Sequence, residues 1–297
     1  MDYVIDQNEM RDGALRRVIQ RPAPCRLILP DTSIVEMSKS TSWQYTMRRS
    51  FEPLSNARDR VFATIAVGEA LRYERDQRKP IDRSTLIDAD ISNFVREMID
   101  VVTSSHRYPG KIVALQKAMD KFRPPLNLLE TNPDKAKAEV VNLTNDLQND
   151  AGPEIHRGLR SGALNKPAQL GLLIVALPHI LKVPYPHLDD MDIARIEIER
   201  PFTFRFVCLK LLNAMRWARD GGLGSAKPST VLNGLLDLEY ALVASFFDNL
   251  LSKDKIATEN LADLKVLIDV SRRSALIEAF RAYLQSRSPA ASAGPSG

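Results

Sequence analysis

Residues 27–37 read LILPDTSIVEM, a short apolar run that ends abruptly in an aspartate and two hydroxyl residues. Brief apolar runs of this kind are typical of buried β-strands, and Pro30 ends this one. Asp31 therefore stands just past the end of a predicted buried strand. Its role depends on whether other carboxylates stand at comparable positions along the chain.

Similar segments recur at both ends of the chain. RVFATI (60–65) is rich in β-branched and aromatic residues and predicts a second strand, which runs directly into the helix-prone AVGEALRYERDQR. Short extended pieces are expected at YVI (3–5) and NLL (249–251). The alternation of strands and helices predicts an α/β fold, with three layers around a mostly parallel sheet.

A long region between these ends, from about residue 80 to residue 219, has apolar residues at three- and four-residue spacing and predicts a large helical insertion. A further helix is expected in TVLNGLLDLEYALVASFF (230–247), with Ser229 or Thr230 as its N-cap. We expect one domain over residues 1–287, with its core at about 26–75 and 228–287. The small polar residues of 288–297 predict a disordered tail.

Composition limits the class of protein. The chain has 297 residues, of which 44% are hydrophobic and 26% charged, as in ordinary globular proteins. Cys25 and Cys208 are too few for a disulfide framework, which favours a reducing compartment and predicts a cytoplasmic location. The acidic N-terminus is unlike a signal peptide. The apolar segment 170–183 is too short to span a bilayer and is interrupted by Pro178, so a buried helix is expected and no membrane association.

Three further acidic residues share the kind of position that Asp31 occupies. Glu69 begins the helix after the second strand, Asp237 lies early in the helix at 230–247, and Asp254 follows the last short strand. In a parallel α/β sheet, strand carboxyl ends and helix amino ends meet at one edge, where ligands bind. Clustered carboxylates repel one another unless a cation compensates them, and Mg²⁺ or Mn²⁺ prefers oxygen ligands. A metal site that hydrolyses phosphodiesters follows as the hypothesis.

In these segments the chain resembles the PIN-domain family of metal-dependent nucleases. LILPDTSIVEM is similar to the first motif, VFATIAVGEALRYE to the second, NGLLDLEYALVA to the third and LLSKDK to the fourth. The resemblance covers about residues 26–75 and 228–258. It implies that the acids Asp31, Glu69, Asp237 and Asp254 are both catalytic and metal-binding, and that Thr32 or Ser33 supports the first of them.

The resemblance also implies the activity and the partners. We expect a three-layer α/β/α PIN-like core and a hydrolase that cuts RNA, or DNA, as an endonuclease with Mg²⁺ or Mn²⁺. An inhibitory partner protein and a homo-oligomer are compatible with such a nuclease. The interval between the second and third motifs is much longer than in small family members, which leaves room for the helical insertion.

Other residues compete for the same roles. Asp6 also follows an apolar triplet and is a rival for the first motif, but its run is shorter and its distance from Glu69 is too long for the family pattern. Glu36 fits either an outer position of the site or a charge on a helix surface. Asn233, one helical turn before Asp237, fits support of the site as well as capping or packing, whereas Glu239 is expected to face solvent.

Two alternatives to the enzyme remain. One is a catalytically inactive module of the same fold that binds nucleic acid or protein. The other is a receiver-like signalling domain with Asp31 as phosphate acceptor, for which only Asp6 and Lys253 could supply the required acid and lysine.

A basic helix within the predicted insertion could guide a nucleic acid. Its charged residues are Arg205, Lys210, Arg216 and Arg219. Arg205, Arg216 and Arg219 are the residues that we expect to contact the phosphates of a nucleic acid. The alternative is that these charges form a solvated helix surface.

Overall fold

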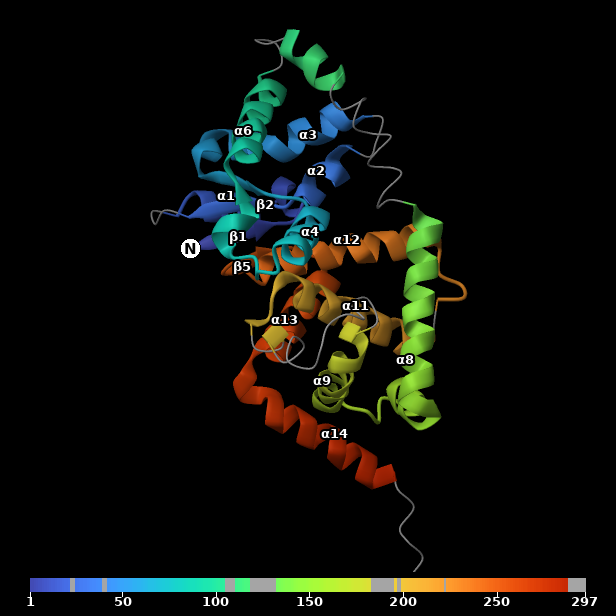
Figure 1. The fold of residues 1–297 in the computed structure, drawn as a ribbon. Helices are drawn as coiled ribbons and strands as arrows, with labels where there is room; N and C mark the ends of the chain where they lie inside the picture. Colours follow the sequence, from blue (N-terminus) through green and yellow to red (C-terminus); the bar gives the residue numbers. More distant parts are fainter. Residues whose placement is uncertain are drawn as a thin grey trace, which may run out of the picture. The chain divides into compact units, whose positions relative to one another are not determined.

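The computed structural model contains a five-stranded sheet (Figure 1). It describes residues 1–21, 25–38, 42–104, 110–117, 132–182, 195–196, 199–221 and 223–287. The predicted tail at 288–297 lies outside these residues. The strand order is β4-β3-β2-β1-β5. The strands are β1 (Asp2–Ile5), β2 (Arg26–Leu29), β3 (Val61–Thr64), β4 (Ile87–Asp88) and β5 (Asn249–Leu251).

The sheet is mixed, with parallel pairing everywhere except at β4. β1 pairs in parallel with β2 and β5, β2 pairs in parallel with β3, and β4 pairs antiparallel to β3. Tyr3 lies opposite both Leu27 and Asn249, so the parallel strands run in register. The predicted α/β class is confirmed. Two of the five strands, β1 and β4, lie outside the residue ranges that the sequence predicts for the core.

The chain folds into two compact units. Unit 1 comprises residues 1–138, 201–203 and 226–261, and unit 2 comprises residues 139–200, 204–225 and 262–297. The helices of unit 1 include α1 (Gly13–Ile19), α2 (Asp31–Ser38), α3 (Trp43–Phe51), α4 (Val67–Gln77), α5 (Arg83–Leu86), α6 (Ala89–Thr103) and α12 (Pro228–Ala244), with the 3-10 helices η1 (Glu9–Arg11) and η2 (Glu52–Arg60). Helix α6, which falls in the predicted insertion, packs against β3 and so belongs to the sheet unit.

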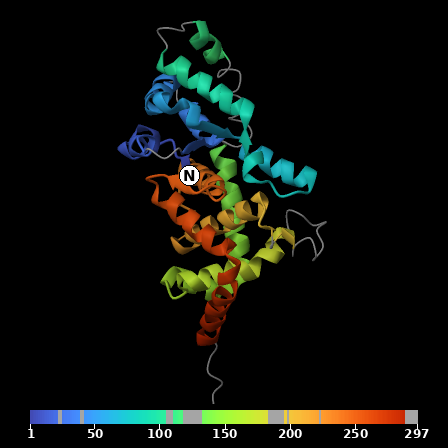
Figure 2. The same ribbon diagram turned by 90° about the vertical axis from the view of Figure 1, so that its left-hand side faces the viewer.

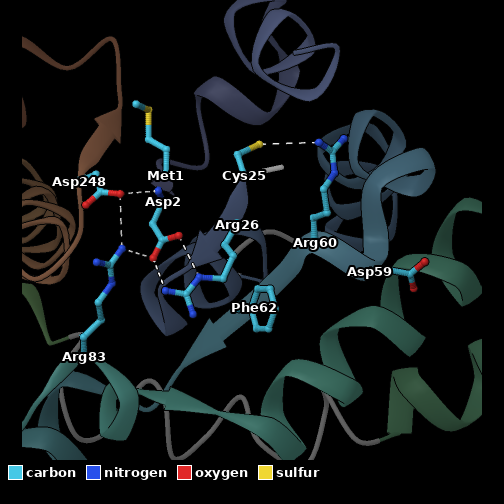
Figure 3. A pocket seen from close by; sticks show the side chains of 9 residues that line it. All are labelled: Met1, Asp2, Cys25, Arg26, Asp59, Arg60, Phe62, Arg83 and Asp248. Atoms are coloured by element: carbon cyan, nitrogen blue, oxygen red, sulfur yellow. Dashed lines mark hydrogen bonds and ion pairs between the residues drawn. The ribbon is translucent and has the colours of Figure 1, made fainter. Parts of the chain in front are cut away.

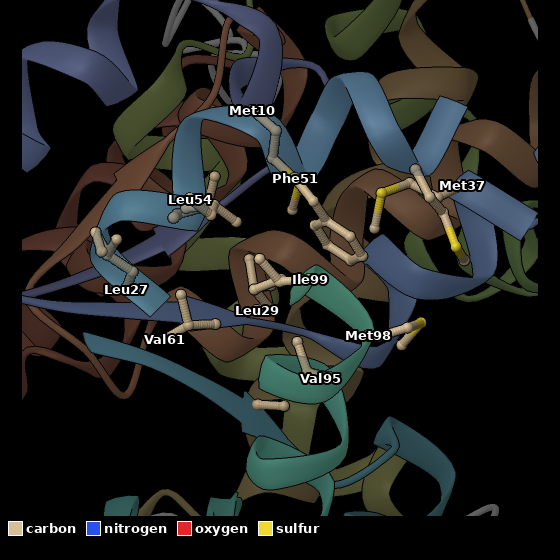
Figure 4. Packing of buried hydrophobic residues seen from close by; sticks show 14 of the residues in the cluster. Met10, Leu27, Leu29, Met37, Phe51, Leu54, Val61, Val95, Met98 and Ile99 are labelled. Atoms are coloured by element: carbon tan, nitrogen blue, oxygen red, sulfur yellow. The ribbon is translucent and has the colours of Figure 1, made fainter. Parts of the chain in front are cut away.

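The main hydrophobic core covers one face of the sheet (Figure 4). Leu27 and Leu29 of β2 and Val61 of β3 point to this face and pack among side chains from α2, α3, η2 and α6. Side chains alternate along a strand, so Val4 and Ile28 point to the opposite face, and both are fully buried. A strand that is buried on both faces has a continuous apolar sequence, so a strand as short as β2 can be recognised from the sequence alone.

Helix α12 begins earlier than predicted. It starts at Pro228 with Lys227 as N-cap, so the prediction of Ser229 or Thr230 as cap is wrong. Proline is favoured in the first turn because that turn has no intrahelical partner for its backbone N–H groups. The helix contacts β1, β5 and α2, which places its middle beside the carboxyl ends of the strands.

Unit 2 is helical. It contains α9 (Lys166–Lys182), η4 (Val270–Arg272) and α14 (Arg273–Arg287), and the division between the units falls inside α8 (Pro133–Ser161), α11 (Phe202–Arg219) and α13 (Lys255–Ile268). α9 and α14 lie side by side in both ribbon views (Figure 2). A Cβ at Gly171 of α9 would stand 2.0 Å from the Leu276 carbonyl oxygen of α14, so glycine permits this close packing. The buried helix expected at 170–183 is largely confirmed by α9, which includes Pro178.

Candidate functional site at the carboxyl end of the sheet

The parallel strands all end on one side of the sheet, here called its carboxyl end. Because β1, β2, β3 and β5 are parallel and in register, the residues that follow Ile5, Leu29, Thr64 and Leu251 emerge together. Asp6 follows β1 directly, Asp31 begins α2 after β2, and Asp254 lies three residues past β5. This arrangement is the one in which α/β proteins bind ligands.

Asp6 is the most deeply buried of these acids, with 1% of its surface exposed. Its Oδ1 accepts a hydrogen bond from the Asn8 backbone N–H at 3.0 Å, and its Oδ2 accepts one from the Ser252 hydroxyl at 2.6 Å. The same hydroxyl accepts a hydrogen bond from the Asp254 backbone N–H at 2.9 Å. Ser252 therefore links the carboxylate at the end of β1 to the segment that carries Asp254.

Asp254 has a structural contact of its own. Its Oδ1 accepts a hydrogen bond from the Ala257 N–H at 2.8 Å, so the carboxylate caps the amino end of α13. A carboxylate at this place is favoured by the helix dipole. The capping fixes the side chain beside the Asp6–Ser252 pair.

Tyr240 of α12 brings Glu36 to the same region. The Tyr240 hydroxyl donates to Glu36 Oε2 at 2.7 Å and accepts a hydrogen bond from the Gln7 backbone N–H at 3.3 Å. Burial, with the negative charges of Glu36 and Asp6 adding to it, raises the pKa of Tyr240 well above its usual value. The phenol therefore stays protonated and remains a donor to Glu36.

The two hydroxyl residues after Asp31 form hydrogen bonds to β1 and to α12. Ser33 Oγ donates to the Ile5 carbonyl oxygen at 3.2 Å, and Thr32 Oγ1 donates to Glu239 Oε2. The prediction that Glu239 faces solvent is therefore wrong, because its carboxylate is tied to α2. These bonds join α2 to β1 and to α12 around the carboxyl end of the sheet.

The structure also places the remaining predicted acids and Asn233. Asp31 is half-buried with its Oδ1 shielded from solvent, Asp237 is half-buried on α12 one turn before Tyr240, and Glu69 is exposed in the first turn of α4. Asn233 is exposed. Over the residues that the structure describes, no group of three or more His, Cys, Asp or Glu side chains is arranged to hold a metal ion.

Buried side-chain oxygens at this end of the sheet include Oε2 of Glu9, in the turn after β1, and Oγ1 of Thr64, the last residue of β3. Neither of these two has a hydrogen-bond partner among the described residues. Glu9 is 3% exposed, and neither it nor Asp6 forms an ion pair within the described part of the chain. Two buried carboxylates without a cationic partner are unfavourable unless a cation compensates them.

The basic residues of α11 belong to the other unit. From Phe204 onward α11 is part of unit 2, whereas the carboxylates above belong to unit 1. Arg205 Nε donates to the Arg200 carbonyl oxygen at 3.0 Å, Lys210 pairs with Glu139, and Arg219 pairs with Asp220 at 2.8 Å. The half-buried Arg216 lies on the same helix, and the guiding role of Arg205, Arg216 and Arg219 stays a prediction.

Comparison of the chain with protein-family models, with curated proteins and with solved structures finds no match in any of the three. None of the described helices is long and apolar enough to cross a membrane. The interpretation of the site therefore rests on its own geometry.

Tyr240 and Ser252 are the residues that the sequence does not point to, whereas Asp6 and Glu36 appear there as alternatives. The signal for Asp6 is that YVID repeats the pattern of an apolar strand followed by an aspartate. This signal is weak because the run is short. In the structure this short run is β1, which is flanked on both sides by parallel strands.

Proposed function

We propose that this protein is a metal-dependent hydrolase of phosphodiester bonds, with RNA as its substrate and a three-layer PIN-like core. The supporting observation is the bonded group at the carboxyl end of the sheet, in which Ser252 joins Asp6 to Asp254 and Tyr240 joins Glu36 to the turn after Asp6. Acidic groups placed at strand ends of an α/β sheet suit a ligand that carries positive charge.

The residue types suit Mg²⁺ or Mn²⁺, and binding would require the acids to draw together, because no three of the described ones are arranged around a common point. Both ions prefer carboxylate oxygens, and the buried carboxylates of Asp6 and Glu9 have no described cationic partner. Asp6, Glu36 and Asp254 are the residues we propose to hold the ion, with Asp31, Glu69 and Asp237 as the further acids expected from the sequence. A bound ion of this kind lowers the pKa of a water molecule and compensates charge on a phosphoryl group.

The protein's own residues hold the carboxylates in place. Ser252 donates to Asp6, so the second carboxylate oxygen keeps a fixed orientation. Tyr240 donates to Glu36 and, because its pKa is raised, keeps that proton over the physiological range. Outer hydrogen bonds of this type orient metal ligands and support their affinity.

RNA cleavage by Asp254→Asn tests the proposal. Asparagine also caps helices, so this variant keeps the bond to Ala257 while it removes the charge. We expect cleavage of single-stranded RNA with Mg²⁺ to be lost in Asp254→Asn and in Asp237→Asn. The control is Glu259→Gln on the exposed surface of α13, which should cleave at the native rate. Native rates in both aspartate variants would exclude these residues from catalysis.

A further inference from the structure

A cavity of about 510 Å³ opens at the amino end of the sheet, on the side opposite to the candidate site. Its walls come from the starts of the strands. Asp2 begins β1, Arg26 begins β2, Arg60 directly precedes β3 and Asp248 directly precedes β5, while Arg83 begins α5 (Figure 3). A cavity of this size is in the range that holds a small organic ligand.

One pair of arginines is already compensated by acids. Arg26 makes two hydrogen bonds to the buried carboxylate of Asp2, and Arg83 also bonds it. Arg83 lies 3.5 Å from Asp248, which in turn accepts the Asp2 backbone N–H at 2.7 Å. The two acids therefore balance the charges of Arg26 and Arg83.

Arg60 carries the positive charge that remains. Its guanidinium donates to the Ile19 carbonyl oxygen at 2.8 Å and to Cys25 Sγ at 3.7 Å, and both acceptors are uncharged. Asp59 is 90% exposed and pairs with Arg58. Within the described residues, no carboxylate forms an ion pair with Arg60.

A second donor in the cavity wall also lacks an acceptor. Nε of Arg83 is buried and has no hydrogen-bond partner in the described part of the chain. This nitrogen has almost no accessible surface, so a ligand in the cavity would meet the other N–H groups of Arg83. Arg26 and Arg83 keep 43% and 37% of their side chains exposed, so their remaining N–H groups are accessible from the cavity.

We propose that this cavity binds a phosphate monoester of about the size of a mononucleotide, with Arg60 as the principal contact to the phosphate. The guanidinium group of arginine forms paired hydrogen bonds to the oxygens of a phosphate. Three such groups, from different elements, can surround a tetrahedral phosphate dianion better than a planar carboxylate. The volume leaves room for the esterified group beside Phe62. The site is separate from the carboxylates at the other end of the sheet and does not depend on the hydrolase activity.

Calorimetric titration of the full chain tests this site with three probes, which are a nucleoside 5′-monophosphate, inorganic phosphate and the nucleoside alone. We expect the monophosphate to bind, phosphate to bind more weakly and the nucleoside not to bind. Arg60→Gln should weaken monophosphate binding about tenfold or more, because a charge-assisted hydrogen bond is lost. Arg49→Gln is the control. Arg49 is exposed on α3, where it bonds the Tyr45 hydroxyl and does not line the cavity, so its replacement should leave binding unchanged.

Arg60→Lys separates loss of binding from misfolding, because lysine keeps the positive charge near Ile19 but cannot form the paired hydrogen bonds of a guanidinium group. Intermediate affinity in this variant supports the assignment. Absence of monophosphate binding by the native chain, or equal affinity in native and Arg60→Gln proteins, overturns it. Equal affinity for phosphate and monophosphate overturns the assignment of an ester.

Discussion

At the scale of single residues, the Tyr240 hydroxyl connects several parts of the candidate site. It is 1% exposed, donates to Glu36 and accepts from the Gln7 backbone. It thereby joins α12, α2 and the turn after β1. A single phenol oxygen holds three segments that are far apart in the sequence.

Tyr240→Phe should lower the free energy of unfolding by about 1–3 kcal/mol, because the Glu36 carboxylate and the Gln7 N–H would each lose a buried partner. Urea denaturation measures the change. Tyr45→Phe is the control, since Tyr45 is 62% exposed and its hydroxyl bonds only at the surface to Arg49. An equal, small change in both variants would mean that the Tyr240 hydroxyl contributes nothing measurable.

Asp2 makes stability depend on pH at the other end of the sheet. Burial acts to raise its pKa, but the hydrogen bonds and charges of Arg26 and Arg83 outweigh it, and the pKa lies below the ordinary value of 3.8. A carboxyl group whose pKa is depressed on folding contributes stability above its unfolded pKa and loses it as the pH falls through the folded pKa.

We therefore expect the native protein to exceed Asp2→Asn in free energy of unfolding at neutral pH, and the difference to shrink as the pH falls below about 4. Denaturation series at several pH values measure this difference. Asp59→Asn, which changes a fully solvated carboxylate, should show little difference at any pH. A gap between native and Asp2→Asn proteins that stays constant down to low pH would contradict the ion-pair explanation.

At the scale of elements, Glu74 ties the end of α4 to the start of α11. Its carboxylate is 8% exposed and accepts four hydrogen bonds at 2.8 Å, from the backbone N–H groups of Ile81, Phe202 and Thr203 and from the Thr203 hydroxyl. The first N–H groups of a helix have no intrahelical acceptor, so Glu74 serves as a cap supplied by another helix.

Glu74→Gln should lower the free energy of unfolding by about 1.5–3 kcal/mol, because an amide NH₂ would face backbone donors where an oxygen stood. Chemical denaturation measures the loss. Glu97→Gln, an exposed residue that pairs with Lys111, serves as control and should change little. A native-like Glu74→Gln protein would show that these four bonds are not needed to hold the start of α11.

The elements differ in how far the sequence could predict them. β2 and β3 are apolar enough to be recognised, since burial on both faces removes polar residues from the run. β5 is a half-buried edge strand, recognised only by its two leucines. β4 has only two residues, and its antiparallel pairing depends on α5 and α6 rather than on a local pattern. The sequence predicts that α6 is part of an insertion, because an amphipathic pattern shows that one side of a helix is buried but does not identify the element that covers it.

The candidate site was predictable in kind and only partly in detail. The rule that acids after parallel strands share one end of the sheet holds for Asp31 and Asp254. Asp6 and Glu36 stand out less in the sequence because their contacts with Ser252 and Tyr240 are not revealed by any spacing. Hydrogen bonds between residues more than 200 positions apart depend on the tertiary fold.

On the scale of the whole molecule, unit 1 carries both proposed sites, one at each end of the same sheet. The carboxyl end gathers buried acids, and the amino end gathers arginines around the cavity. This separation of charge along one set of parallel strands suits a different ligand at each end, which we propose to be a cation at one and a phosphate ester at the other. Unit 2 contributes neither set of side chains.

We propose that the carboxylates after β1 and β5 form a site for a divalent cation. Calorimetric titration with Mn²⁺ tests it most directly, in the native protein, in Asp6→Asn and in the control Glu259→Gln. We predict that the native and control proteins bind Mn²⁺ and that Asp6→Asn does not, because the buried carboxylate is lost while its shape is kept. Failure of the native protein to bind Mn²⁺, or undiminished binding by Asp6→Asn, would contradict the claim.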